Sequence, residues 1–270
     1  MRVDEHTINL DDSPVFYRSG SDAPAVPGAP TLYLHGIPTS SDDWVEFLAR
    51  TGGFAPDLQG FGRSGKGGHL DYSLAGLTQF LERFLAEIQV QTVKLVAHDW
   101  GAAVALMLAE RHPNRVERMV LFNPPPLFDG FAWPRPIRLW RTPLVGEGLM
   151  GSTSRWLLAR TLRQGSVRED AWPEPRIAAV WDQFDQGTQR AILRLVRDAA
   201  ARRPPSERTT LEVPALIIWG ERDPWYPPAL ADAYAAGLPG ARTERLPDAG
   251  HWPWLDRGDL VDRVAAFLEA

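Results

Sequence analysis

The stretch that decides the fold is LVAHDWGAAVAL, residues 95–106, because it joins a predicted strand to a predicted helix through one sharp turn. An apolar run ends at Ala97, and an alanine-rich helical pattern follows Gly101. Asp99 lies two positions from each of these small residues. A strand, a tight turn and a helix in this order lift one side chain above the edge of a parallel sheet. We therefore expect the carboxylate of Asp99 to be presented to a site.

Short apolar runs alternate with helical patterns on both sides of this stretch. Extended segments are expected at 6–10, 14–18, 31–35, 53–58, 93–97, 116–122, 214–219 and 241–246. Helices are expected after Ser40 or Ser41, over 74–88, after Asp99 and over 260–268. This alternation predicts an α/β protein whose mostly parallel sheet is covered by helices on both faces.

The region after the strand at 116–122 has a different texture. It begins with Pro124-Pro125-Pro126, is rich in Arg and Trp, and suggests several helices without strands between them. We expect a core domain formed by 1–123 and 209–270, with a helical cap of 124–208 inserted after the sixth strand. Such an insertion lies over the carboxyl ends of the strands, where open α/β sheets bind their ligands.

Composition excludes several classes of protein. The chain has 270 residues, a formal net charge of -5 and no cysteine, so thiolate catalysis, disulfides and cysteine-ligated metals are excluded and a nucleic-acid partner is not expected. The first residues show no basic segment followed by an apolar run, and no stretch of about 18 apolar residues is present. A soluble, cytoplasmic protein without a membrane partner is expected. Oligomeric state is not predicted.

Three predicted loops at the carboxyl ends of strands carry groups suited to catalysis. In chain order they hold Asp99, then Asp223 in GERDP, then His251 in DAGHW. A nucleophile, an acid and a histidine in this order form a recognised catalytic triad arrangement. Glu221 and Asp248 are rival partners for His251, and the position of Asp223 within its loop favours Asp223.

The carboxylate at position 99 restricts the chemistry. Attack by Asp99 on an acyl carbon would give an anhydride, whereas displacement at a saturated carbon gives an ordinary alkyl ester. Neutral His251 could then activate water against the ester carbonyl, with Asp223 fixing its tautomer. The backbone N–H groups of Ile37 and Trp100 are the expected oxyanion donors.

Three motifs resemble those of the α/β-hydrolase fold: HGIPTSSDDW (35–44), APDLQGFGRSGK (55–66) and HDWGA (98–102). The resemblance covers nearly the whole chain and is closest to the branch of haloalkane dehalogenases and epoxide hydrolases. It implies a hydrolase that needs no metal or organic cofactor and acts on a small apolar organic substrate with water.

The resemblance leaves two leaving groups open. A halide needs only weak donors in a dry pocket, and an indole N–H is such a donor. Trp100 matches the first halide-stabilising residue of the dehalogenases, and Trp133 or Trp140 of the cap could be the second. Epoxide hydrolases resembling this chain use cap tyrosines as acids, but no tyrosine lies in 124–208. The haloalkane dehalogenase reading is therefore favoured. The alternative is an epoxide hydrolase with the same triad and an unusual acid, such as Tyr226.

Two positions depart from the dehalogenase pattern. Many of these enzymes have Asn after His-Gly, where this chain has Ile37, which offers only its backbone N–H. One branch takes its triad acid from the end of the strand before the cap, where this chain has Asn123. An amide cannot supply that charge, which again favours Asp223.

Overall fold

The computed structural model describes residues 2–20, 28–127, 133–199 and 211–270. Its strands form one sheet of eight in the order β1-β2-β4-β3-β5-β6-β7-β8. The strands are β1 Val3–Leu10, β2 Ser13–Gly20, β3 Thr31–Leu34, β4 Gly53–Pro56, β5 Val93–His98, β6 Val116–Phe122, β7 Ala215–Gly220 and β8 Arg242–Leu246. The pairs β1–β2 and β2–β4 are antiparallel, and every pair from β4 to β8 is parallel. The predicted α/β class with a mostly parallel sheet is confirmed.

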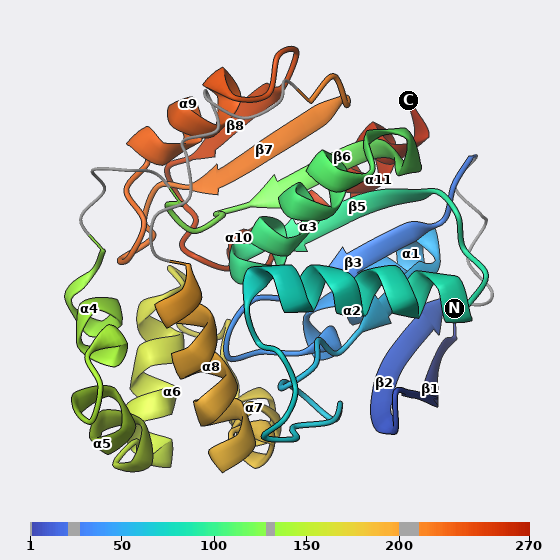
Figure 1. The fold of residues 1–270 in the computed structure, drawn as a ribbon. Coiled ribbons are helices and arrows are strands. Elements are labelled where there is room, and N and C mark those ends of the chain that lie inside the picture. The colour runs from blue at the N-terminus through green and yellow to red at the C-terminus, as the bar shows by residue number, and fades with distance from the viewer. Residues whose placement is uncertain (1, 21–27, 128–132, 200–210) are drawn as a thin grey trace.

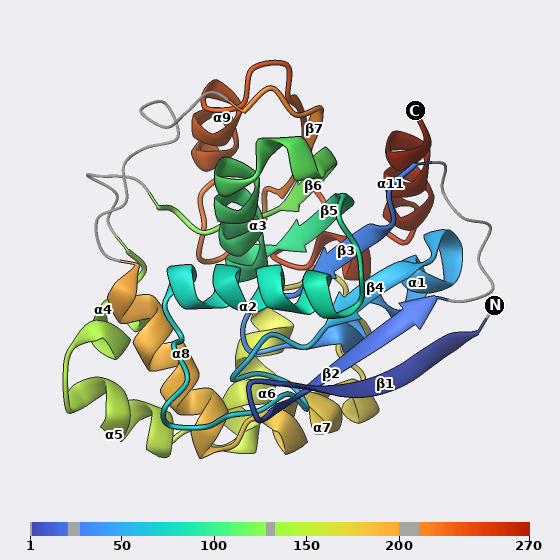
Figure 2. The same ribbon diagram turned by 45° about the vertical axis from the view of Figure 1, so that its right-hand side comes forward.

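Helices cover both faces of this sheet (Figures 1 and 2). The core helices are η1 Ser41–Trp44, α1 Val45–Thr51, α2 Leu74–Glu87, α3 Asp99–Arg111, η2 Pro113–Arg115, α9 Ala229–Ala236, α10 Pro253–Asp256 and α11 Leu260–Glu269. Helices α2 and α3 lie together on one face, and α1 and α11 lie together on the other. The sequence patterns had indicated most of these elements, but no helix had been assigned to 229–236.

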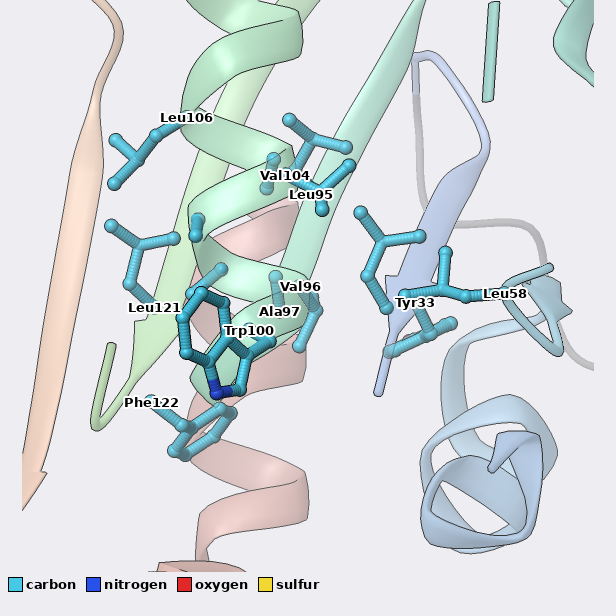
Figure 3. Close-up of a cluster of buried hydrophobic side chains, with 14 of the residues drawn as sticks. Tyr33, Leu58, Leu95, Val96, Ala97, Trp100, Val104, Leu106, Leu121 and Phe122 are labelled. Carbon is cyan, nitrogen blue, oxygen red and sulfur yellow. The ribbon is translucent and has the colours of Figure 1, made fainter. Parts of the chain in front are cut away.

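The central strands are mostly apolar because both of their faces are covered. Every residue of β3, β5 and β7 is buried. Side chains of these strands and of α3 form part of the hydrophobic core, in which Trp100 and Phe122 are buried (Figure 3). Burial of apolar surface stabilises the fold by about 25 cal/mol per Å². This packing holds the ends of β5 and β6 in place relative to the helices around them. The loops at these ends therefore have rigid supports.

Between β6 and β7, the described residues form five helices, which lie at the carboxyl edge of the sheet (Figure 1). They are α4 Arg135–Arg141, α5 Val145–Gly151, α6 Arg155–Gln164, α7 Glu174–Gln183 and α8 Gln186–Asp198. No strand occurs among the described residues between β6 and β7. The helical texture agrees with the predicted cap, but its boundary at 208–209 lies outside the described residues, so the domain limits stay a prediction.

The cap is tied to a glycine-rich loop of the core. Lys66 Nζ donates to the carbonyl oxygen of Gln183 at 2.8 Å, and Arg194 donates to that of Gly68 at 2.8 Å. Gln183 also donates from Nε2 to Asp42 at 3.1 Å. These contacts hold α7 and α8 over the site edge of the sheet.

Within the described residues, no helix has both the length and the apolar character that crossing a bilayer requires.

Candidate active site

Asp99 begins α3 directly after β5, with a φ of 48°. This left-handed conformation is strained for most residues and is tolerated by Asp better than by most others. Two glycines make the turn possible: a Cβ at Gly101 would lie 2.4 Å from the carbonyl oxygen of His35, and one at Gly36 would lie 2.7 Å from the Asp99 Cβ. The N-cap residue of α3 is His98, whose side chain makes no capping hydrogen bond. Asp99 itself is the first residue of α3 and is held in this turn.

The two oxygens of the Asp99 carboxylate have different partners. The Ile37 N–H donates to Oδ2 at 3.2 Å, and the Tyr226 hydroxyl donates to Oδ1 at 3.0 Å. The residue is only 1% exposed. Burial raises the pKa of Asp99 to about 6, although nearby His251 and the hydrogen bonds from Ile37, Tyr226 and the Trp100 backbone oppose this rise. The carboxylate is ionised at neutral pH, but it is poorly solvated.

Asp223 is paired with His251 and has hydrogen bonds to both of its oxygens. Its Oδ2 accepts from His251 Nδ1 at 2.6 Å and from Asn123 Nδ2 at 2.8 Å. Its Oδ1 accepts from the backbone N–H groups of Trp225 at 2.8 Å and Tyr226 at 3.1 Å. Since Nδ1 of His251 carries the proton in this pair, Nε2 is left as the basic nitrogen of the neutral ring. Four hydrogen bonds therefore hold the carboxylate of Asp223 in place.

The charge balance of His251 follows from this pairing. Burial lowers its pKa, but the charge of Asp223 and the hydrogen bond to it raise the pKa above its ordinary value, and Asp99 adds to the rise. The rival acids lie elsewhere: Glu221 pairs with Arg245 at 3.7 Å, and Asp248 pairs with Arg257 at 3.0 Å.

Two further histidines support the backbone around the site. His98 is fully buried and accepts or donates only as a neutral ring, because burial lowers its pKa well below the ordinary value. Its Nε2 donates to the His251 carbonyl oxygen at 2.8 Å. His35 accepts from the Leu58 N–H through Nε2 at 2.9 Å. Both rings therefore position the loops that carry Ile37 and His251.

The predicted halide donors are only partly brought together. Trp100 is 1% exposed, and its Nε1 is buried without a hydrogen-bond partner in the part of the chain that the structure describes. The ring of Trp133 stacks on it at 5.9 Å with an interplanar angle of 2°. Trp140 lies on α4 and packs, partly buried, against the hydrophobic core. No contact found among the described residues joins Trp140 to Asp99, so its role stays a prediction.

Sequence reasoning undervalued two residues at the site. Asn123, considered only as a failed acid, holds Asp223 through Nδ2 and accepts from the Gly220 N–H through Oδ1 at 2.9 Å. Tyr226, considered only for the alternative reaction, contacts Asp99 directly. The signal for Tyr226 is its place three residues after Asp223, which returns the chain towards the site.

A second buried carboxylate lies near the site on η1. Asp43 is 7% exposed, and burial raises its pKa to about 7. Its Oδ2 has no hydrogen-bond partner among the residues described, and its charge interacts with that of His251. Nothing in the sequence SDDW distinguishes this position from a solvated acid.

A cavity of about 620 Å³ opens between the start of α4 and the loop after β7. Trp225 lines it, together with Pro134, Gln164 and Pro224. The Trp225 ring also contacts the His251 ring edge-on at 4.8 Å. The cavity therefore lies one aromatic ring away from the histidine.

Across the described ranges, no group of three or more histidine or acidic side chains has an arrangement that could hold a metal ion.

Comparison with known proteins identifies the family of this chain. A family model described as the alpha/beta hydrolase fold matches residues 30–257. A haloalkane dehalogenase of Mesorhizobium japonicum is 29% identical over 289 residues, which cover 95% of this chain and 88% of that protein. Epoxide hydrolase 3 of Xenopus tropicalis is 27% identical, over 86% of this chain and 69% of that protein.

Solved structures show the same fold. The Cif epoxide hydrolase from Acinetobacter nosocomialis superposes with a TM-score of 0.86 at 16% identity, over 98% of this chain and 89% of that one. At this identity the likeness concerns the fold. With the matching family model and the relatives above, it leads to one conclusion: the chain belongs to the alpha/beta hydrolase fold family and is a hydrolase.

Proposed function

We propose that the protein hydrolyses a small apolar substrate through an alkyl ester on Asp99. Oδ2 accepts from the Ile37 N–H, and Oδ1 accepts from the Tyr226 hydroxyl. We assign the attack on a saturated carbon to Oδ1, because Oδ2 then stays with the backbone donor that stabilises the later oxyanion. The carbon–oxygen bond forms as the bond to the leaving group breaks, and the leaving group departs with the electron pair. The observation that carries this proposal is a buried carboxylate on the strained turn, next to a paired His251 and Asp223.

The second step regenerates the carboxylate. Nε2 of His251 takes a proton from water as that water attacks the ester carbonyl of Asp99. The oxyanion forms where the Ile37 and Trp100 N–H groups already hydrogen-bond the carboxyl group. Asp223 stabilises the imidazolium, because its Oδ2 remains bonded to Nδ1. Collapse of the oxyanion breaks the bond between the carbonyl carbon and the alkyl oxygen, which takes the proton from His251 and leaves as an alcohol.

The leaving group that the site supports best is a halide, which makes the protein a haloalkane dehalogenase-like enzyme. The buried Trp100 Nε1 has no acceptor in the described part of the chain, so its N–H can bind a halide without breaking another hydrogen bond. The Trp133 ring stacks on Trp100 and supplies a second indole near the proposed halide position. The dehalogenase of Mesorhizobium japonicum is similar over most of both chains.

The test is halide release from a panel of 1-bromoalkanes and 1-chloroalkanes of increasing chain length. The proposal predicts release that Asp99→Asn abolishes. If a folded sample releases no halide at any chain length, the dehalogenase assignment is wrong.

Epoxide hydrolysis is the second candidate, because a phenolic hydroxyl lies 3.0 Å from Asp99 Oδ1. An opened epoxide leaves as a tethered alkoxide that needs a proton, and Tyr226 carries one. Diol formation from styrene oxide, without halide release from any alkyl halide, would select this candidate. Both candidates use the same three residues. The cytoplasmic location expected from the sequence stays a prediction.

A further inference from the structure

The loop after α6, residues 165–173, lies directly against the loop that carries the proposed catalytic histidine. The His251 N–H donates to the carbonyl oxygen of Gly165 at 2.6 Å, and His98 Nε2 donates to the His251 carbonyl oxygen at 2.8 Å. A Cβ at Gly250 would clash with the same carbonyl oxygen of Gly165. Glycine at position 250 therefore permits this close approach, and the backbone of His251 is held on both sides.

One buried carboxylate of the core joins these two loops. Asp256 is the last residue of α10 and is 7% exposed. Its Oδ1 accepts from the backbone N–H groups of Val167 at 2.8 Å and Arg168 at 2.9 Å, both in the loop after α6. Its Oδ2 accepts from the Gly250 N–H at 2.7 Å, next to His251. The two oxygens of one side chain therefore bond the cap on one side and the catalytic loop on the other.

This link affects where the imidazole lies. Asp223 fixes the orientation of the His251 ring through Nδ1, but the position of the ring also depends on the backbone that carries it. Hydrogen bonds to a carboxylate are stronger than those between neutral groups, so Asp256 holds both loops firmly. Without that carboxylate, three backbone N–H groups lose their acceptor, and the loops lose the bonds that align them.

We propose that Asp256 is a positioning residue that sets His251 for hydrolysis of the alkyl ester by holding its loop against the cap. This inference rests on the proposed function and concerns only its second step. In the first step, the Asp99 carboxylate displaces the leaving group without proton transfer to His251. In the second step, Nε2 of His251 must reach the attacking water, and a misplacement of about 1 Å can slow a reaction about 100-fold. The two steps therefore differ in their dependence on Asp256.

The experiment follows both steps in one reaction with 1-bromobutane. Samples are quenched with acid at intervals. Intact-protein mass spectrometry then measures the fraction of protein that carries a butyl group, and gas chromatography measures butanol. Asp256→Asn keeps the size of the side chain but replaces one acceptor oxygen with an NH₂ donor, so one loop loses its bond. Ester hydrolysis should slow roughly 10- to 100-fold, and ester formation should stay within about twofold, so the butyl ester accumulates.

Asp170 supplies the matched control. It lies in the same loop after α6, is exposed, and pairs with the Arg168 side chain at 2.5 Å. Asp170→Asn removes an acidic group from this loop without touching the bonds to Asp256, so both rates should be unchanged. Asp256→Glu keeps two acceptor oxygens on a longer side chain, so it should retain the fold and show an intermediate hydrolysis rate.

A second measurement separates positioning from a general loss of structure. In His251→Gln, hydrolysis no longer uses the imidazole, so adding Asp256→Asn should not slow the residual hydrolysis further. Ester formation in this double variant should match that of His251→Gln alone, because Asp99 is unaffected. A general loss of structure slows both reactions in either background.

The outcomes separate the two proposals. If no bromide is released and neither wild type nor His251→Gln gains a butyl group, the proposed function fails, and this inference fails with it. If the group is gained and Asp256→Asn hydrolyses the ester as fast as wild type, the positioning role is overturned. Equal slowing of ester formation and hydrolysis would also overturn it, because that result indicates a general structural role.

Discussion

The core loops and the aromatic cap differ in how firmly they hold their functional groups. Asp99 and Asp223 accept hydrogen bonds from other elements of the core, and His251 donates one to Asp223. Of the two cap tryptophans expected to bind halide, Trp133 stacks on Trp100, and Trp140 packs against the core. Directional bonds fix an atom's position for chemistry, whereas ring packing fixes only the shape of a pocket. The core should therefore determine the reaction, and the cap should determine which molecules reach it.

The largest expected effect is that of replacing the nucleophile. Asp99→Asn keeps the shape of the side chain but removes the anion, so halide release should fall by about 10⁴-fold or more. The same variant should be more stable, because the pKa of Asp99 is raised from 3.8 to about 6 in the folded protein. That shift amounts to up to about 3 kcal/mol against the ionised folded state.

The direction of the Asp99 pKa shift determines the pH range in which the Asp99→Asn variant is the more stable protein. Below the unfolded pKa of 3.8 the carboxyl group is protonated in both states, so Asp and Asn should be equally stable. The gain of the Asn variant should develop as the pH rises from 3.8 to about 6 and should be complete above that. Urea unfolding at acid and neutral pH measures it, and a gain that grows towards acid pH would contradict the account.

A smaller effect is expected where the core supports the triad indirectly. Asn123→Ala removes the donor to Asp223 Oδ2 and the acceptor for the Gly220 N–H. We expect kcat/KM to fall roughly 10- to 100-fold, since an acceptor and a donor are left unsatisfied in the interior. Asn114, which is exposed, provides the control substitution Asn114→Ala. Equal activity of the two variants would show that Asp223 does not depend on this amide.

The pH dependence of the first step tests the coupling between the core residues. Transfer of the butyl group of 1-bromobutane to Asp99 needs the ionised carboxylate. The rate of this transfer should therefore rise with pH around a midpoint near 6. Protonated His251 lowers the pKa of Asp99, and His251→Gln removes that charge. The midpoint should therefore move to higher pH in His251→Gln, as measured by the burst of halide release. A shift of the midpoint to lower pH would contradict the proposed electrostatic coupling between Asp99 and His251.

The smallest effects are expected in the cap. Trp140→Phe keeps the packing against the core and should change halide release by less than about twofold, since conservative exchanges cost little. Trp100→Phe removes the buried N–H and should slow release about tenfold. If Trp140→Phe slows halide release more than Trp100→Phe does, the proposed division of roles between core and cap is wrong.

Much of the core could be predicted because its signals are local. The strand before Asp99 is mostly apolar, and Gly101 marks the close approach of α3 to β3. Parallel strands bring their carboxyl ends to one edge, so the loops of Asp99, Asp223 and His251 were expected together. The structure brings these three buried residues close together.

The remaining features depend on contacts between distant segments. Asn123 bonds to Asp223 across 100 residues of sequence, and Tyr226 reaches Asp99 across 127. The elevated pKa of Asp43 arises from burial, which a polar motif does not reveal. The orientation of the cap tryptophans follows from helix packing, which the Arg- and Trp-rich composition does not specify. Such features become visible only when the segments are assembled.

The central claim is that the substrate carbon becomes bonded to an oxygen of Asp99. A single turnover of the wild-type enzyme with limiting 1-bromobutane in oxygen-18 water tests it directly. Because water attacks the ester carbonyl, the account predicts unlabelled butanol and one heavy oxygen in the peptide that contains Asp99. Labelled butanol in the first turnover, with an unlabelled peptide, would mean that water attacks the carbon itself and would contradict the account.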